Sequence, residues 1–365
     1  MQEKGTLYII YPGLRCYYIY KEAQKRGYKI ASLDIYDQTE KIFQYRGVKE
    51  YFRAKHMTPI ELDDDFSRTM QINDDVREKV MFISEVPKIN LYDLELKPED
   101  HIVGFDELTL FEMSCLNPNI LKPYYALMYS CKHFYYKKIG IPFKKIINEK
   151  QIEESLPGDF IFKPCVNAIG KRNIFRIKSK EDIYKIIVRN PEYFMWERIY
   201  MLQDYVPHVS EVWAMTFFDK DQKPYILWYS TEKGHATFSP FEEDIYKKIK
   251  EINNKLKIKN WMAFIQFLIL ENGEVMFLDL NPRLPGDDFW HEDLYKHLTG
   301  ESFAEKVLDL ILDKTPPPII KSYNYITEEE YNPSKPLLSN QKKWDYSDNY
   351  KENPVLTFKS LDLKK

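Results

Sequence analysis

Short apolar runs alternate with amphipathic stretches over the first hundred residues of the chain. Residues 7–11 and 29–34 each read as a short buried strand, and the stretch between them has a helical pattern that ends at Gly27. A third strand is predicted at residues 101–105. Glu107, just beyond it, is a minor candidate for ligand contact, although a helix start explains it more simply. The pattern predicts the strand, helix, strand opening that is typical of doubly wound sheets.

Helical patterns return in three later segments. Residues 121–141 are aromatic and basic and close on Gly-Ile-Pro, which predicts a buried connecting helix. Residues 242–258 carry isoleucine and leucine at helical spacing, and residues 303–312 form another amphipathic stretch. From residue 314 onward proline, asparagine and lysine accumulate. This composition predicts an extended or partly disordered appendage.

The strongest local signal lies at residues 264–286, FIQFLILENGEVMFLDLNPRLPG, where two apolar strands flank an Asn-Gly pair. Asn-Gly favours a two-residue hairpin loop, because both residues tolerate a positive φ. With residues 272–273 as the loop, Gln266 lies directly opposite Asp279. The sequence therefore predicts a hairpin of defined register.

Polar side chains gather on one face of this predicted hairpin. Asn281 and Arg283 follow Asp279 at steps of two residues, so they share its face with Gln266. Carboxylate and amide oxygens are the ligands that Mg²⁺ prefers, usually together with substrate phosphates. Gln266, Asp279 and Asn281 are therefore candidate metal ligands, and Arg283 would supply a fixed positive charge.

Composition narrows the possible function. The 365-residue chain of 43.9 kDa is 44% hydrophobic and 30% charged, which is typical of a globular protein with two or three domains. A formal net charge of −3 argues against a dedicated nucleic-acid binder. The GxGxxG fingerprint is absent from the opening segment, so a dinucleotide site has little support.

Cysteine usage and hydropathy bear on the cellular compartment. The four cysteines, Cys16, Cys115, Cys131 and Cys165, show no CxxC or metal-ligand spacing, and we interpret them as reduced thiols. The N-terminus has no apolar run of signal-peptide length, and nowhere do about 18 apolar residues follow one another. We expect a cytoplasmic protein that does not contact a membrane.

The segment FLDLNPRLPG resembles the metal-binding strand of ATP-grasp enzymes, in which glutamate usually stands where this chain has Asp279. The resemblance implies an α/β (α+β) fold, with an N-terminal Rossmann-like pre-ATP-grasp domain followed by a two-lobed ATP-grasp fold. It divides the chain into a pre-ATP-grasp domain at residues 1–115, an N-lobe at 116–200, a C-lobe with the metal site at 201–315, and a C-terminal extension at 316–365.

Two lysines match the phosphate-binding segments of the family. Lys163 ends the apolar run FIFKP and precedes a small-residue loop and a return strand at 174–177, which resembles the family's mobile phosphate loop. The family's other phosphate lysine precedes Gly-Ile-Pro by about eleven residues, a position held here by residues 128–129. Lys132, about one turn later, is the nearest candidate.

The segment MLQDYVPHVSEVWAM resembles the hinge that holds the adenosine. The resemblance implies that Glu211 binds the ribose hydroxyls and that adenine is read by the backbone of Gln203, Asp204, Tyr205 and Val206. A carboxylate suits the first task because it accepts hydrogen bonds from both hydroxyls. Residues 231–240 are expected to form a loop of uncertain role, in which Lys233 and His235 would meet phosphate or a second substrate unless they are simply solvated.

The resemblance implies an ATP-dependent carboxylate-amine ligase that uses ATP and Mg²⁺, with Mn²⁺ as an alternative ion. Such an enzyme activates a carboxylate as an acyl phosphate, releases ADP and transfers the acyl group to an amine. Lys163 and Arg283 would serve catalysis, and an amino acid or small peptide is the implied substrate. A catalytically impaired ATP-binding regulatory protein and a bicarbonate-dependent carboxylase are the alternatives. Homodimers are frequent in such families.

Overall fold

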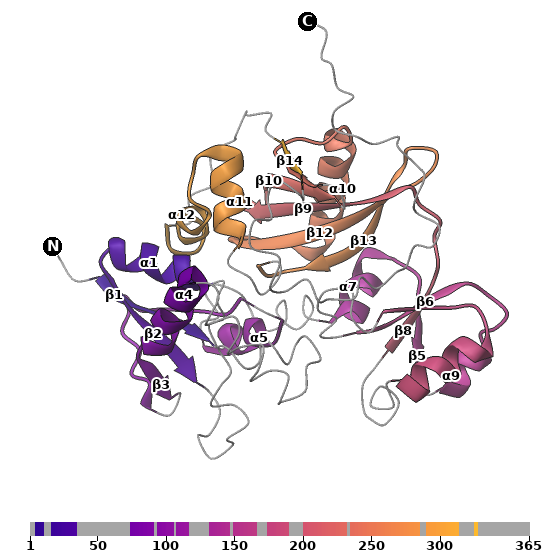
Figure 1. Ribbon diagram of the computed structural model, residues 1–365, viewed down its shortest axis with the longest axis horizontal. Helices are drawn as coiled ribbons and strands as arrows, with labels where there is room; N and C mark the ends of the chain where they lie inside the picture. Colours follow the sequence, from indigo (N-terminus) through magenta and orange to yellow (C-terminus); the bar gives the residue numbers. More distant parts are fainter. Residues whose placement is uncertain are drawn as a thin grey trace, which may run out of the picture.

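The computed structural model describes residues 4–10, 16–34, 74–90, 93–105, 107–116, 131–146, 149–165, 174–189, 200–231, 234–284, 290–313 and 325–327. They form three β-sheets that follow one another along the chain, with helices packed around them (Figure 1). None of the helices in these ranges is long and apolar enough to cross a lipid bilayer. The architecture is mixed α/β, as the sequence predicts.

The first sheet is parallel, with the strand order β3-β2-β1-β4. Its elements are β1 (Lys4–Ile10), α1 (Tyr17–Lys25), β2 (Tyr28–Asp34), α4 (Asp74–Glu85), β3 (Lys88–Asn90), β4 (His101–Val103) and α5 (Glu107–Leu116). Helix α1 stops where Gly27 takes a φ of 87°, which glycine adopts without steric cost. The predicted strand, helix, strand opening is confirmed, and Glu107 is the first residue of α5.

The second sheet is antiparallel, with the order β5-β8-β6-β7. Its elements are β5 (Lys144–Ile146), α8 (Glu149–Glu153), β6 (Phe160–Pro164), β7 (Phe175–Ile177), α9 (Lys180–Arg189) and β8 (Tyr200–Asp204). The sheet and its helices enclose a small core of their own, in which Phe162 stacks on Tyr200 with ring centroids 4.7 Å apart. A separate core makes this sheet a lobe in its own right.

The third sheet has six strands in the order β13-β12-β9-β10-β11-β14. Its elements are β9 (Ser210–Phe218), β10 (Pro224–Thr231), β11 (Gly234–Ala236), α10 (Glu242–Leu256), β12 (Trp261–Ile269), β13 (Val275–Asn281), α11 (Trp290–Thr299), α12 (Phe303–Leu308), a π-helical turn (Asp309–Asp313) and β14 (Tyr325–Thr327). The predicted helices at residues 242–258 and 303–312 are confirmed. Strand β13, which carries Asp279 and Asn281, lies at one edge.

The prediction of a loop at residues 231–240 is wrong for its central part. Residues 234–236 form β11, which pairs with β10 on one side and with β14 on the other. His235 is buried, and its Nδ1 lies 2.8 Å from Ser230 Oγ, so it is not a solvated loop histidine. Lys233 lies outside the described residues. Its second partner, β14, comes from far along the chain, which a local pattern does not reveal.

The turn of the β12–β13 hairpin differs from the predicted one. Gly273 N–H donates to Leu270 O at 2.9 Å, and Leu270 N–H donates to Glu274 O at 3.0 Å. Gly273 has a φ of 80°. The loop between Leu270 and Glu274 therefore has three residues and closes on a left-handed glycine, a common alternative to the two-residue loop that Asn-Gly favours.

A β-bulge corrects the register that this longer loop would otherwise shift. Phe267 pairs with Phe277 and the adjacent Gln266 pairs with Asp279, so Leu278 has no residue opposite it on β12. The predicted pairing of Gln266 with Asp279 is confirmed, although the loop that was expected to set it is wrong. Bulges are frequent beside functional sites, where they redirect a side chain.

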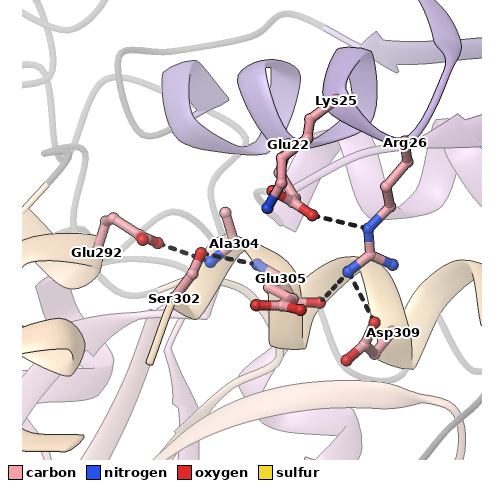
Figure 2. A network of polar contacts seen from close by, with 8 residues as sticks. All are labelled: Glu22, Lys25, Arg26, Glu292, Ser302, Ala304, Glu305 and Asp309. Atoms are coloured by element: carbon pink, nitrogen blue, oxygen red, sulfur yellow. Dashed lines mark hydrogen bonds and ion pairs between the residues drawn. The ribbon is translucent and has the colours of Figure 1, made fainter. Parts of the chain in front are cut away.

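An arginine at the end of α1 contacts helix α12 and the π-helical turn that follows it (Figure 2). Arg26, at the end of α1, pairs with Glu22 at 3.0 Å and with Asp309 at 2.8 Å, and its guanidinium also donates to Glu305 O at 3.1 Å. Only 16% of its side chain is exposed. Nearby, Ser302 Oγ caps α12 by accepting from Glu305 N–H. Arg26 therefore joins α1 of the first sheet to helical segments that follow β13, far apart in sequence.

We expect Arg26→Ala to lower the temperature of the first unfolding transition by about 2–8 °C, which corresponds to about 1–2 kcal/mol. The cause is the loss of charged hydrogen bonds that leaves Asp309 without its arginine. Differential scanning calorimetry measures the shift. Lys25→Ala is the matched control, since Lys25 also pairs with Glu22 but is 74% exposed and should change little. Equal transitions in both variants would contradict the prediction.

Candidate functional site

Helix α7 (Lys132–Ile139) precedes the second sheet along the chain and contacts residues of both the second and the third sheet. Cys131 is extended, and Lys132 N–H donates to Cys165 O at 2.8 Å, so the helix begins at Lys132. The prediction of one helix through residues 121–141 is therefore wrong at residue 131, while residues 117–130 lie outside the described part. At the other end Gly140 and Ile141 both donate to Tyr136 O, as predicted from the Gly-Ile-Pro signal.

Asp279 is the centre of a buried polar cluster. Its Oδ2 accepts a hydrogen bond from Lys132 Nζ at 2.5 Å, and its Oδ1 accepts from Tyr135 OH and from Leu280 N–H. Burial by itself would raise the pKa of Asp279, but the charges of Lys132 and Lys163 and these hydrogen bonds outweigh it and lower the pKa. The carboxylate is therefore ionised at neutral pH.

Lys163 reaches the same cluster from the end of β6. Its Nζ donates to Tyr136 OH at 2.7 Å, and Tyr136 OH in turn donates to Leu278 O at 2.5 Å. Leu278 is the bulge residue of β13. The bulge thus anchors a tyrosine that holds a lysine from the other lobe. Burial lowers the pKa of Lys163 to about 8, against the attraction of Asp279.

This pKa makes anion binding at Lys163 dependent on pH. In the free protein Lys163 is mostly charged at pH 7 and mostly neutral at pH 9, and binding a phosphate at pH 9 requires proton uptake. We expect the affinity for ATP to fall about tenfold from pH 7.5 to pH 9.5, measured by calorimetry. Lys163→Arg should flatten the profile, because a guanidinium stays charged throughout. An equally flat profile in the unaltered protein would contradict the assignment.

The predicted metal ligands lie together, but they carry little charge. Gln266 is half-buried opposite Asp279, and Asn281 is buried two residues further along β13. In the described part of the chain no three His, Cys, Asp or Glu side chains converge on a possible metal position. Two neutral amides, next to a carboxylate that already pairs with Lys132, fit a single Mg²⁺ that takes most of its ligands from phosphates and water. They do not fit a pair of ions.

Arg283 lies beyond the end of β13. It is 5% exposed, and its Nη1 donates to Leu284 O at 3.1 Å. Lys132 and Lys163 make the surroundings of Asp279 positive. Such a cluster suits an anionic ligand.

The hinge residues lie at the end of β8, where a stacked arginine fixes their backbone. Tyr205 N–H donates to Asp159 O at 2.8 Å, and the Arg176 guanidinium lies 3.5 Å from the centre of the Tyr205 ring. Arg176 also binds the Asp159 carboxylate at 2.7 and 2.5 Å, which lowers the pKa of Asp159. Gln203 and Asp204 are the last residues of the strand. The contacts of Tyr205 with Asp159 and Arg176 therefore hold the backbone of the hinge residues in one conformation.

Glu211 lies at the start of β9, shortly after the hinge residues 203–206 along the chain. Its Oε1 lies 3.8 Å from His208 Nε2, while His208 Nδ1 donates to Val206 O at 2.8 Å. Both Glu211 and His208 are nearly buried. Glu211 also contributes to the electrostatic surroundings of Lys163. The hinge, the glutamate and the lysine thus belong to one continuous region.

Sequence reasoning missed several members of this region. Tyr135 and Tyr136 were interpreted as part of an aromatic packing helix, and only their i, i+3 and i+4 spacing from Lys132 indicates that they share its surroundings. No sequence pattern indicates that Cys131 and Cys165 meet, yet they hydrogen-bond to each other, each within two residues of one of the two lysines along the chain. The hydrogen bond from Cys165 and the proximity of His133 lower the pKa of Cys131 to about 5 although burial opposes the shift.

No family model and no curated protein matches the sequence. Solved structures do match. The L-amino acid ligase from Bacillus licheniformis has a TM-score of 0.58 at 12% identity, over 88% of this chain and 79% of that chain. N5-carboxyaminoimidazole ribonucleotide synthetase from Thermotoga maritima has a TM-score of 0.54 at 15% identity, over 88% and 78%. Carboxyaminoimidazole ribonucleotide synthase from Aspergillus clavatus, complexed with ATP, has a TM-score of 0.54 at 14% identity, over 88% of this chain and 81% of that chain.

Identities this low establish a common fold and leave the substrate open. The matches extend through the parallel N-terminal sheet as well as the two later sheets, since they cover 88% of this chain. They also agree with the resemblance carried by the FLDLNPRLPG segment. The chain therefore has the ATP-grasp fold.

Proposed function

We propose that this protein is an ATP-dependent carboxylate-amine ligase that releases ADP and phosphate. The observation that carries the proposal is the meeting of Lys132, Lys163 and Asp279, from helix α7 and two different sheets of an ATP-grasp fold. A buried carboxylate between two lysines suits a site where phosphate charge is handled. Such a cluster would be unfavourable in a purely structural core, because burying three charges costs free energy.

The nucleotide lies across the hinge and the lysines in this proposal. Tyr205 N–H and Val206 O are engaged within the protein, and in this proposal the Val206 N–H donates to the adenine edge. Glu211 accepts from the ribose hydroxyls, and Lys163 binds the phosphates. Gln203 and Asp204 flank the base as the remaining hinge residues. The rigid backing of Tyr205 by Arg176 favours one orientation of the base.

The reaction is a phosphoryl transfer followed by an acyl transfer. A substrate carboxylate oxygen attacks the γ-phosphorus of ATP, the bond to the β-phosphate oxygen breaks, and ADP leaves. An amine then attacks the acyl carbon, and inorganic phosphate leaves with the amine losing a proton. Lys163 and Arg283 neutralise charge on the phosphoryl group and on the acyl phosphate, so positioning and electrostatics supply most of the catalysis.

Magnesium would enter with the ATP. Of the three predicted ligands, Gln266 and Asn281 would supply oxygen ligands, while Asp279 stays paired with Lys132, and the ion would offset the charge of the triphosphate. The acid is proposed to be an amino acid or small peptide, a choice supported by the fold shared with an L-amino acid ligase. The amine is left open.

The test uses hydroxylamine, which intercepts acyl phosphates and needs no knowledge of the natural amine. The purified protein is incubated with Mg-ATP, hydroxylamine and pools of amino acids, peptides and other carboxylic acids, while hydroxamate and ADP are measured. Hydroxamate with an equal amount of ADP in one pool supports the ligase and identifies the acid. AMP in place of ADP would overturn the acyl-phosphate route. ATP binding without product in any pool would favour a nucleotide-binding regulator, and ADP release that requires bicarbonate would favour a carboxylase.

A further inference from the structure

The closest ion pair of the site joins a lysine to a candidate metal ligand. Lys132 Nζ and Asp279 Oδ2 are 2.5 Å apart, and only 7% and 9% of the two side chains are exposed. Tyr135 OH binds the other carboxylate oxygen and lies 3.4 Å from Lys132 Nζ. Both oxygens of Asp279 are therefore already engaged.

The charges around Asp279 disfavour a divalent ion on this carboxylate. Lys132 lies against it, and Lys163 is close enough to both to influence their charges. A divalent cation on Asp279 would meet two ammonium groups in a buried setting, where repulsion between like charges is weakly screened. The other oxygen donors on this face, Gln266 and Asn281, are neutral and do not offset that repulsion.

We propose that Lys132 replaces a divalent ion at this carboxylate. Its ammonium group is the cation that links Asp279 to the transferring phosphoryl group. An ammonium has three N–H donors, of which Asp279 and Tyr135 take two, and the third binds a phosphate oxygen. Each ATP is then bound with one divalent ion, the one carried by its phosphates. The inference rests on the proposed function and adds to it a fixed number of divalent ions, one for each bound ATP.

Helix α7 gives the lysine the rigidity that this role needs. Lys132 is the first helical residue, its N–H is bonded to Cys165 O, and Tyr135 on the next turn binds the same carboxylate. The side chain is therefore set by a helix that contacts both the second and the third sheet. A charge held this firmly requires little reorganisation during phosphoryl transfer.

The experiment counts divalent ions rather than product. Mn²⁺ is titrated into the protein with a saturating non-hydrolysable ATP analogue, and free Mn²⁺ is followed by electron paramagnetic resonance. We expect one Mn²⁺ per bound nucleotide in the unaltered protein and two in Lys132→Met, where Asp279 becomes available. Nucleotide affinity in Lys132→Met should also rise roughly tenfold for a tenfold increase in sub-saturating Mg²⁺, beyond the dependence seen in the unaltered protein.

Two further variants separate charge from structure. Lys132→Arg keeps a positive charge and should bind one Mn²⁺, while Lys138→Met, at an exposed lysine of the same helix, should match the unaltered protein. Two Mn²⁺ in the unaltered protein, or one in a folded Lys132→Met, would overturn the inference while leaving the ligase intact. If Lys132→Met does not fold, the count in the unaltered protein decides. Failure of the unaltered protein to bind the nucleotide would instead overturn the proposed function, and the inference with it.

Discussion

Replacing Lys163 by alanine is expected to lower turnover at least about 100-fold, the usual effect of losing one preorganised charge contact in an active site. Lys163 is 2% exposed and is held by Tyr136, so no neighbouring cation from solvent can take its place. The hydroxamate assay, run with the acid identified in the pools, measures the loss. ATP binding should weaken as well, because the lysine contacts phosphate in the ground state.

The control for this variant is Lys145→Ala, at an exposed lysine on β5 of the same sheet. It removes the same charge from the same lobe and should leave turnover and ATP affinity unchanged. Near-normal turnover in a folded Lys163→Ala would remove Lys163 from the proposed machinery. Circular dichroism and the unfolding temperature establish that the variant is folded.

Replacing Asp279 by alanine is expected to lower turnover by at least about 100-fold and also to destabilise the protein. Without the carboxylate, Lys132 and Lys163 lose the charge between them, and breaking a buried ion pair costs about 3–5 kcal/mol. Hydroxamate formation at saturating Mg-ATP measures the first effect, and thermal unfolding measures the second.

Two variants separate the catalytic loss from the stability loss. Asp279→Asn keeps the shape of the side chain while removing its charge and replacing one accepting oxygen by an NH2 donor, so turnover should still fall when folding is preserved. Glu271→Ala, at the exposed tip of the same hairpin, should have no effect on either quantity. A well-folded Asp279→Asn with undiminished turnover would show that the carboxylate charge is not required.

Local pattern predicted much of the fold, because most elements here carry their own signals. The amphipathic spacing of residues 242–258 gave α10, and Gly27 and Gly140 ended helices where they were expected to. The start of α7 was not predictable in this way. It depends on Lys132 N–H bonding to Cys165 O, a contact across 33 residues of chain that leaves no local trace.

The hairpin shows how a correct prediction can rest on an incorrect reason. Asn-Gly was expected to form the whole loop and thereby to place Gln266 opposite Asp279. The loop has one residue more, and the bulge at Leu278 restores the pairing. Residue types indicated the chemistry of Lys163 and Asp279, whereas the tyrosines that hold these two charges became evident only once helix and sheet were brought together.

The strand that carries Asp279 is an edge strand, and an open edge can pair with the edge of another chain. Helix α7 counters this, since Tyr136 occupies the carbonyl of Leu278 and both tyrosines pack on Phe277. The helix that positions Lys132 therefore also guards the sheet against aggregation. A chain whose α7 fails to dock would lose its binding site and its protection from intermolecular strand pairing together, so misassembled molecules would tend to precipitate rather than persist as inactive protein.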